Sequence, residues 1–218
     1  DPCLEPDNGS GTVTLPPAGC QYLSPADVHK IIAGLPAGTE IHFAAIHDKF
    51  INVTTAPGGS LGGEVENFGS GLQLHLKGTG ALAGWTRDIS LGNVQCVTHV
   101  GPRTPGQPVQ SFDTDMFRLF GEITGDPDFD LLRITAGTDF GMPSPGHTTL
   151  TRQGPPGSSW AVDSFFDITY RIDFVGKPSG RLGGMSGSTT ATIRMAVASP
   201  YPPLSIICPP DKTVIANG

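Results

Sequence analysis

The sequence contains few basic residues. Thirteen Lys and Arg residues stand against 20 Asp and Glu residues, which gives a formal net charge of −7. The basic residues are scattered singly along the chain. A protein that binds nucleic acid through the phosphate backbone needs a patch or stripe of basic side chains. The composition therefore excludes nucleic acid as an expected partner.

Long apolar runs are also missing. A helix that spans a membrane needs about 18 or more consecutive apolar residues. No run in this sequence approaches that length. The sequence therefore predicts no membrane span.

Cysteine is scarce, with four residues that lie far apart and form no C-x-x-C pair. This spacing disfavours zinc ribbons and thioredoxin-like redox chemistry. Cys3 and Cys20 flank a segment rich in Pro and Gly that has few apolar residues to anchor it, so we predict a disulfide between them. Cys96 and Cys208 are harder to place, and a pairing between them is only a weak prediction. A disulfide favours an oxidising compartment, and we expect a secreted or cell-surface protein.

Residues that form turns are abundant instead, with 30 glycines and 21 prolines. From Glu40 onward, runs rich in β-branched and aromatic residues alternate with clusters of Gly, Pro, Asn and Ser. About nine runs have the length and period of a strand, among them EIHFAAI, LQLHLKG, MFRLFGEIT and FDITYRIDF. This pattern predicts an all-β fold, an antiparallel β-sandwich or a barrel-like sheet of about nine or more strands.

One segment has the signals of a helix. In SPADVHKIIAGLP, Ser24 suits the N-cap, Pro25 the first helical position and Gly34 the stop. The sequence therefore predicts a short helix over residues 24–34 that caps the sheet. We divide the chain into an N-terminal arm (1–23), a β-sandwich domain (24–199), and a segment (200–218) that is a Pro-rich linker followed by a terminal strand or the start of another module.

The stretch GDPDFD places acidic residues at every second position. It lacks the Gly and the Glu that an EF-hand loop requires at its sixth and twelfth positions. Gly, Asp and Pro are the residues that turns select, so the main prediction is a turn between two strands. The alternative is a calcium ion held by Asp128 and Asp130 together with Asp113 and Asp115 from FDTD, if the two stretches meet at one edge of the sheet. No other cofactor is expected.

No motif with a catalytic mechanism is present. GMSGS lacks the G-x-S-x-G spacing of a nucleophile elbow, and the Gly-rich stretches precede no P-loop lysine. Trp85 and Trp160 are available for a sugar-binding platform, although aromatic residues more often pack in a core. We therefore expect a protein that is not an enzyme.

Two stretches carry resemblances to known proteins. The tail SIICPPDKTVIANG resembles the start of a hyalin-repeat or related Ig-like module. The segments from GPRTPGQPVQ to GHTTLTR, SFFDITYRIDFVG and SGSTTATIRM resemble an uncharacterised family of secreted bacterial β-rich proteins. The second resemblance implies an exported β-domain and carries over no activity and no catalytic residue.

These observations favour a structural or adhesive extracellular module whose partners are copies of itself or neighbouring modules. GTVTLPP near the start and DKTVIANG at the end alternate like strands, and donation of either strand to an open sheet edge builds a filament. The alternative is a secreted domain that binds polysaccharide, with or without calcium. A secreted hydrolase with a site assembled from distant loops is a third hypothesis.

Overall fold

In the computed structural model, residues 2–25 and 29–200 are described, and this part of the chain forms eleven β-strands and two single-turn 3-10 helices. The strands are β1 (Cys3–Glu5), β2 (Gln21–Leu23), β3 (His29–Ile31), β4 (Ile41–Pro57), β5 (Glu64–Gly78), β6 (Thr86–Val100), β7 (Val109–Thr124), β8 (Phe129–Ala136), β9 (Pro145–Arg152), β10 (Trp160–Gly176) and β11 (Ser186–Ala198). The 3-10 helices are η1 (Gly80–Leu82) and η2 (Thr138–Phe140).

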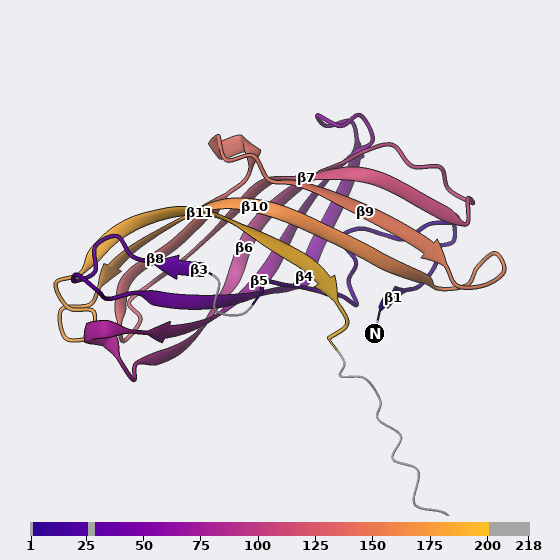
Figure 1. The fold of residues 1–218 in the computed structure, drawn as a ribbon. Coiled ribbons are helices and arrows are strands. Elements are labelled where there is room, and N and C mark those ends of the chain that lie inside the picture. Colours follow the sequence, from indigo (N-terminus) through magenta and orange to yellow (C-terminus); the bar gives the residue numbers. More distant parts are fainter. Residues whose placement is uncertain (1, 26–28, 201–218) are drawn as a thin grey trace, which may run out of the picture.

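All strand pairings are antiparallel, and the sheet closes on itself (Figure 1). The strands follow the order β10, β11, β2, β4, β5, β6, β7 and β8, and β8 then pairs with β10. Opposite walls also contact each other, since Phe43 on β4 and Tyr170 on β10 have ring centroids 5.7 Å apart. The predicted all-β antiparallel fold is confirmed. It takes the barrel-like form, with walls that pack face to face as in a sandwich.

In two places, a pair of short strands fills the position of one long strand in the closed sheet. β8 and β9 follow one another between β7 and β10, and each pairs with both of these neighbours. The segment that contains η2 lies between β8 and β9 in the chain. β2 and β3 likewise both pair with β4. Long strands therefore supply most of the wall, and pairs of short strands complete it.

The prediction of a helix over residues 24–34 was wrong for the part that the structure describes. His29–Ile31 is strand β3, which pairs with β4, and residues 26–28 lie outside the described residues. His29 and Ile31 are buried, whereas Ile32 is 54% exposed. An isolated helix of about ten residues is marginal in water. Pairing with β4 gives the same residues backbone hydrogen bonds and buries Ile31 in the core.

The N-terminal arm belongs to the same sheet. β1 pairs with β10, and β2 pairs with β11 and β4. The predicted β-like run from Thr12 to Leu15 forms no strand. Its apolar side chains Val13 and Leu15 are nevertheless buried in a small cluster with Trp160. The arm therefore packs on its own chain through side chains and through two short strands on either side of this run.

Buried and less buried side chains alternate along the strands, and the buried ones form the core. On β10, the side chains at every second position from Trp160 to Phe174 are buried. Most strands contribute in this way to a main cluster of buried apolar residues, while the arm and the ends of β6, β7, β9 and β10 form a smaller second cluster. The space where the two clusters meet contains the candidate functional site.

Candidate functional site

A cavity of about 70 Å³ lies inside the closed sheet. Its walls come from almost every long strand and from Leu15, Pro16 and Pro17 of the arm. Most of the lining side chains are apolar, among them Phe43, Phe50, Phe68, Met116, Phe166 and Met195. Concave, largely apolar spaces with a few polar groups are the usual form of small-molecule binding sites. Two methionines in the wall give it adaptable packing.

The alternation of β5 places a carboxyl group in this apolar wall. Glu66, Phe68, Ser70 and Leu72 point to the same face of the strand, and all four are buried. Glu66 and Leu72 line the cavity. Glu66 was not predicted as a site residue, because the following Gly-Ser-Gly triplet interrupts the strand pattern of the first half of β5. Its spacing of two from Phe68 was the signal that could have revealed it.

Several polar groups of the wall are satisfied by neighbouring side chains. The hydroxyl of Tyr22 donates to Ser164 Oγ at 3.0 Å, and Ser164 Oγ lies 2.7 Å from Thr148 Oγ1. His47 Nε2 lies 2.6 Å from Ser70 Oγ. The first two hydrogen bonds tie β2, β9 and β10 together, and the third ties β4 to β5. They also fix the orientation of the two rings.

The interior carries little charge at neutral pH. Burial raises the pKa of the Glu66 carboxyl to about 8, the negative charge of Glu64 acts in the same direction, and Arg103 opposes both. Glu66 is therefore protonated and neutral at pH 7. Burial lowers the pKa of His47 to about 4, so this imidazole is also neutral. Neutral groups are what an apolar environment of this kind tolerates.

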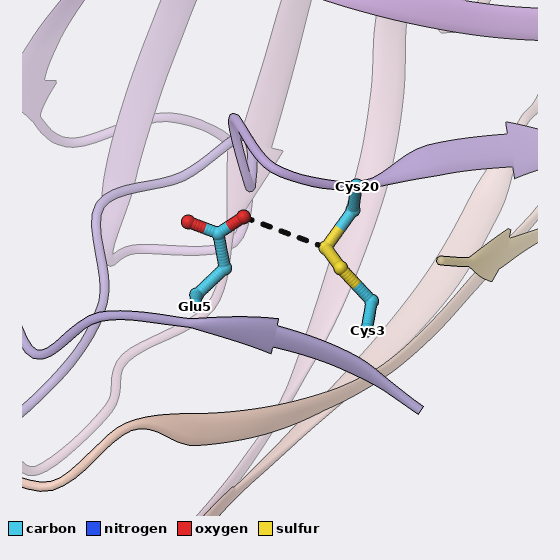
Figure 2. A group of neighbouring side chains, drawn as sticks. All are labelled: Cys3, Glu5 and Cys20. Carbon is cyan, nitrogen blue, oxygen red and sulfur yellow. Dashed lines mark hydrogen bonds between the residues drawn. A yellow bond between two sulfur atoms is a disulfide. The ribbon is translucent and has the colours of Figure 1, made fainter. Parts of the chain in front are cut away.

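The predicted disulfide between Cys3 and Cys20 is confirmed. It closes the arm into a loop, and Leu15 and the two following prolines, shortly before Cys20 in that loop, form part of the cavity wall. Figure 2 shows Glu5 beside the disulfide, with its Oε1 atom 3.5 Å from Cys20 Sγ. Among the described residues, these three are the only acidic, His or Cys side chains grouped closely enough to hold a metal ion. Both sulfurs are used by the disulfide, so the oxidised protein has no thiolate to offer there.

The structure does not bring the four predicted calcium ligands together. Asp113 and Asp115 point outward near the start of β7, and Asp128 and Asp130 lie beyond its other end, at the start of β8. Nine residues separate Asp115 from Thr124 at the end of β7, which corresponds to about 30 Å along a strand. Calcium binding by all four residues has no geometric support.

The aspartates that were predicted to bind calcium contact different groups. Asp113 Oδ1 lies 2.9 Å from His147 Nδ1, and Asp115 accepts a hydrogen bond from Thr138. The carboxylate of Asp128 accepts hydrogen bonds from the indole of Trp85 and from the backbone N–H of Arg181. Asp130 is exposed.

The stretch GDPDFD forms the predicted turn between β7 and β8. Gly125 has a φ of 72°, a left-handed conformation that glycine adopts without strain. Asp126 Oδ1 accepts a hydrogen bond from the backbone N–H of Asp128 at 2.9 Å, which is the side-chain bond typical of an Asx turn. Arg87 forms ion pairs with both Asp126 and Asp128. The acidic residues therefore stabilise a reversal of the chain.

A line of Ser, His and Asp side chains lies on the outer face of the sheet. Ser111 Oγ is 2.8 Å from His147 Nε2, and His147 Nδ1 is 2.9 Å from Asp113 Oδ1. This is the hydrogen-bond order of a catalytic triad. The Asp113 side chain is 78% exposed, however, and none of the three residues lines the interior cavity. Acyl-transfer sites depend on preorganised donors from which water is excluded. The cavity is therefore the stronger candidate for a functional site. The hydrogen bonds among Ser111, His147 and Asp113 link β7 to β9.

The aromatic residues considered for sugar binding are not available as a surface platform. Trp160 is fully buried and Trp85 is 7% exposed. The indole N–H of Trp160 donates to Asp7 at 3.0 Å, which fastens the arm to β10. These side chains pack in the two cores, as aromatic residues usually do.

The segment proposed as a donated N-terminal strand packs against its own chain. Thr12 Oγ1 donates to Gln110 Oε1 at 2.7 Å, and the backbone N–H of Gly106 donates to the carbonyl of Gly11 at 2.8 Å. The geometry therefore gives no support to donation of GTVTLPP. The other segment, DKTVIANG, and the predicted module start lie outside the described residues.

The fold and the cavity define an all-β protein with a closed antiparallel sheet and a largely apolar interior site. Comparison with known proteins adds no relative to this description: no family model, no curated protein and no solved structure matches the chain. Within residues 2–25 and 29–200, no helix has the length and apolar character needed to cross a membrane.

Proposed function

We propose that this protein is a non-enzymatic extracellular module that binds a small, mostly apolar molecule inside its closed sheet. The observation that carries this proposal is the cavity itself, which is lined by apolar side chains from opposite walls and by three residues of the disulfide-closed arm. Closed sheets of about eight strands have an interior wide enough to hold one small ligand. The Cys3–Cys20 disulfide supports the extracellular part of the proposal.

The arm supplies a removable wall for this site. Leu15, Pro16 and Pro17 reach the cavity without belonging to a strand. Displacing them breaks no hydrogen bond between the long strands. A ligand can therefore enter where the arm covers the interior, while the rest of the sheet remains closed.

Toluene is a suitable probe because it is apolar and compact. A cavity that holds benzene has about 150 Å³, so toluene enters this space of about 70 Å³ only if the arm moves outward. Binding to the native state raises the melting temperature by mass action. At ten times its dissociation constant, toluene stabilises the protein by about 1.4 kcal/mol, which corresponds to roughly 3–6 °C for a chain of this size. Scanning calorimetry with and without toluene measures this shift.

Two neighbouring alanines provide a matched pair of variants. Ala45 lines the cavity, whereas Ala44 lies on the opposite face of β4. We expect Ala45→Leu to fill the space and abolish the toluene shift, and Ala44→Leu to retain it. Ala136→Leu, a second filling variant at a cavity position, checks that the loss comes from volume. The proposal fails if toluene leaves the wild-type melting temperature unchanged, or shifts the filled variants equally.

A further inference from the structure

Three polar atoms around the cavity have no hydrogen-bond partner among the described residues. They are Glu66 Oε1, Thr114 Oγ1 and the hydroxyl oxygen of Tyr170, and all three residues line the cavity. A buried polar atom left unpaired costs about 1–3 kcal/mol. Native structures contain few such atoms, and each needs an explanation. A ligand that pairs with Glu66 and Thr114 explains two of these three atoms; the Tyr170 hydroxyl is not part of the proposal.

Glu66 and Thr114 belong to the same end of the interior. Glu66 on β5 lies opposite Thr98 on β6, and Val100, two residues further along β6, lies opposite Thr114 on β7. Their backbones are therefore two strands apart across the sheet, about 10 Å, and offset by two residues along it, about 7 Å, which together correspond to about 12 Å. Both side chains are buried and point inward. This separation leaves room for one small polar group between them.

The charges around this end cancel. Arg103 Nη2 donates to Glu64 Oε1 at 2.7 Å, so these two groups neutralise each other. Burial keeps Glu66 protonated at neutral pH, as described above. An ionised head group would enter without a counter-charge, which is costly in an apolar interior. The head group that fits is uncharged.

A hydroxyl group meets the remaining requirement. A protonated carboxyl has one oxygen that donates and one that only accepts, and a threonine hydroxyl does both. Glu66 also forms a side-chain hydrogen bond with Glu64 that raises its pKa, so its proton faces Glu64 and Oε1 remains an acceptor. A ligand hydroxyl donates to Glu66 Oε1 and accepts from Thr114 Oγ1. Ethers and hydrocarbons lack the donor.

We propose that the cavity recognises an uncharged molecule with an apolar body and one hydroxyl group, and that this hydroxyl bonds to Glu66 Oε1 and Thr114 Oγ1. The proposal rests on the proposed function, because it concerns the ligand of the same cavity. It adds the polar chemistry that selects one class of apolar molecule over others.

Four probes with the same ring test this selection: toluene, benzyl alcohol, benzylammonium and benzoate. Titration calorimetry at pH 7 measures the dissociation constant of each. We expect benzyl alcohol to bind about tenfold more tightly than toluene. The two ions should bind more weakly than toluene.

Substitutions then assign the preference to the two side chains. Glu66→Met and Thr114→Val remove the polar atoms with little change in volume, and each should weaken benzyl alcohol about tenfold without weakening toluene. Glu66→Gln keeps a donor and an acceptor and should restore most of the affinity. Thr98→Val is the matched control, because Thr98 also lines the cavity and its hydroxyl is not one of the unpartnered atoms.

The outcomes separate the two proposals. If toluene binds but benzyl alcohol binds no better, or if Glu66→Met and Thr114→Val leave benzyl alcohol unchanged, hydroxyl recognition is wrong and the apolar site remains. If benzylammonium binds most tightly, Glu66 acts as an anion and the proposal is overturned. If no probe binds, the proposed function fails together with it.

Discussion

Replacing Glu66 by glutamine should change how the stability of this protein depends on pH. The folded-state pKa of Glu66 is raised from an ordinary value of 4.5 to about 8, mainly by burial. A carboxyl group with a raised folded-state pKa gives its full contribution below the unfolded-state pKa and loses it as the pH rises through the folded-state pKa. Glutamine has a similar shape and no ionisable proton, so Glu66→Gln removes this contribution.

The size of the effect follows from the same values. Between pH 4.5 and 8 the wild type loses on the order of 5 kcal/mol through Glu66, at about 1.4 kcal/mol per pH unit. His47 acts in the opposite direction, because its pKa is lowered from 6.5 to about 4 and its contribution is lost as the pH falls. The two effects oppose each other between pH 4.5 and 6.5. Between pH 6.5 and 8 only the Glu66 effect remains, which is roughly 2 kcal/mol.

Urea denaturation at pH 5.5, 6.5, 7.2, 8 and 9 measures the free energy of unfolding of both proteins. From pH 6.5 to 8 we expect a loss of roughly 2 kcal/mol in the wild type and a much smaller change in Glu66→Gln. Contributions from other titrating groups cancel in the difference between the two. Parallel profiles would refute the reasoning, because they would show that Glu66 ionises in the folded protein as it does in water.

Three further predictions concern the disulfide, a turn and a buried thiol. Replacing Cys3 and Cys20 together by serine should lower the free energy of unfolding by about 3 kcal/mol in urea denaturation, because the disulfide closes a loop of this size; an unchanged midpoint contradicts this. Gly125→Ala should destabilise by about 1 kcal/mol because its φ is 72°, whereas Gly92→Ala, at a position with open space and no left-handed φ, should not. Cys96 should resist thiol reagents until the protein unfolds, since it is buried and burial raises its pKa to about 12; rapid labelling of the native protein would show otherwise.

The features that could be predicted from the sequence are local ones. Alternation with a period of two appears in runs such as FDITYRIDF, and the same residues form the inward and outward faces of β10. The turn at GDPDFD followed from residues that suit a reversal of the chain. The helix over residues 24–34 was predicted from equally good local signals and was wrong, because pairing with β4 outweighed them. Local preference decides only where no stronger tertiary contact competes.

The candidate site illustrates what local patterns cannot show. Glu66 and Thr114 lie 48 positions apart in the sequence, and nothing near either residue indicates that they line one cavity. Their meeting depends on the register of β5 with β6 and of β6 with β7. Asp113 and Asp115 show the converse, because a register that points Thr114 inward points both carboxylates outward.

The sequence by itself determined the all-β class, the positions of most strands and the Cys3–Cys20 disulfide, because alternation, turn residues and cysteine spacing act over short stretches of chain. Only the tertiary structure decided that the sheet closes through β8 and β10, that the arm covers the interior, and that a neutral carboxyl lines an apolar cavity. The physical reason is that closure and burial depend on contacts between distant segments. Their energies, and the pKa values that burial creates, exist only once those segments are packed together.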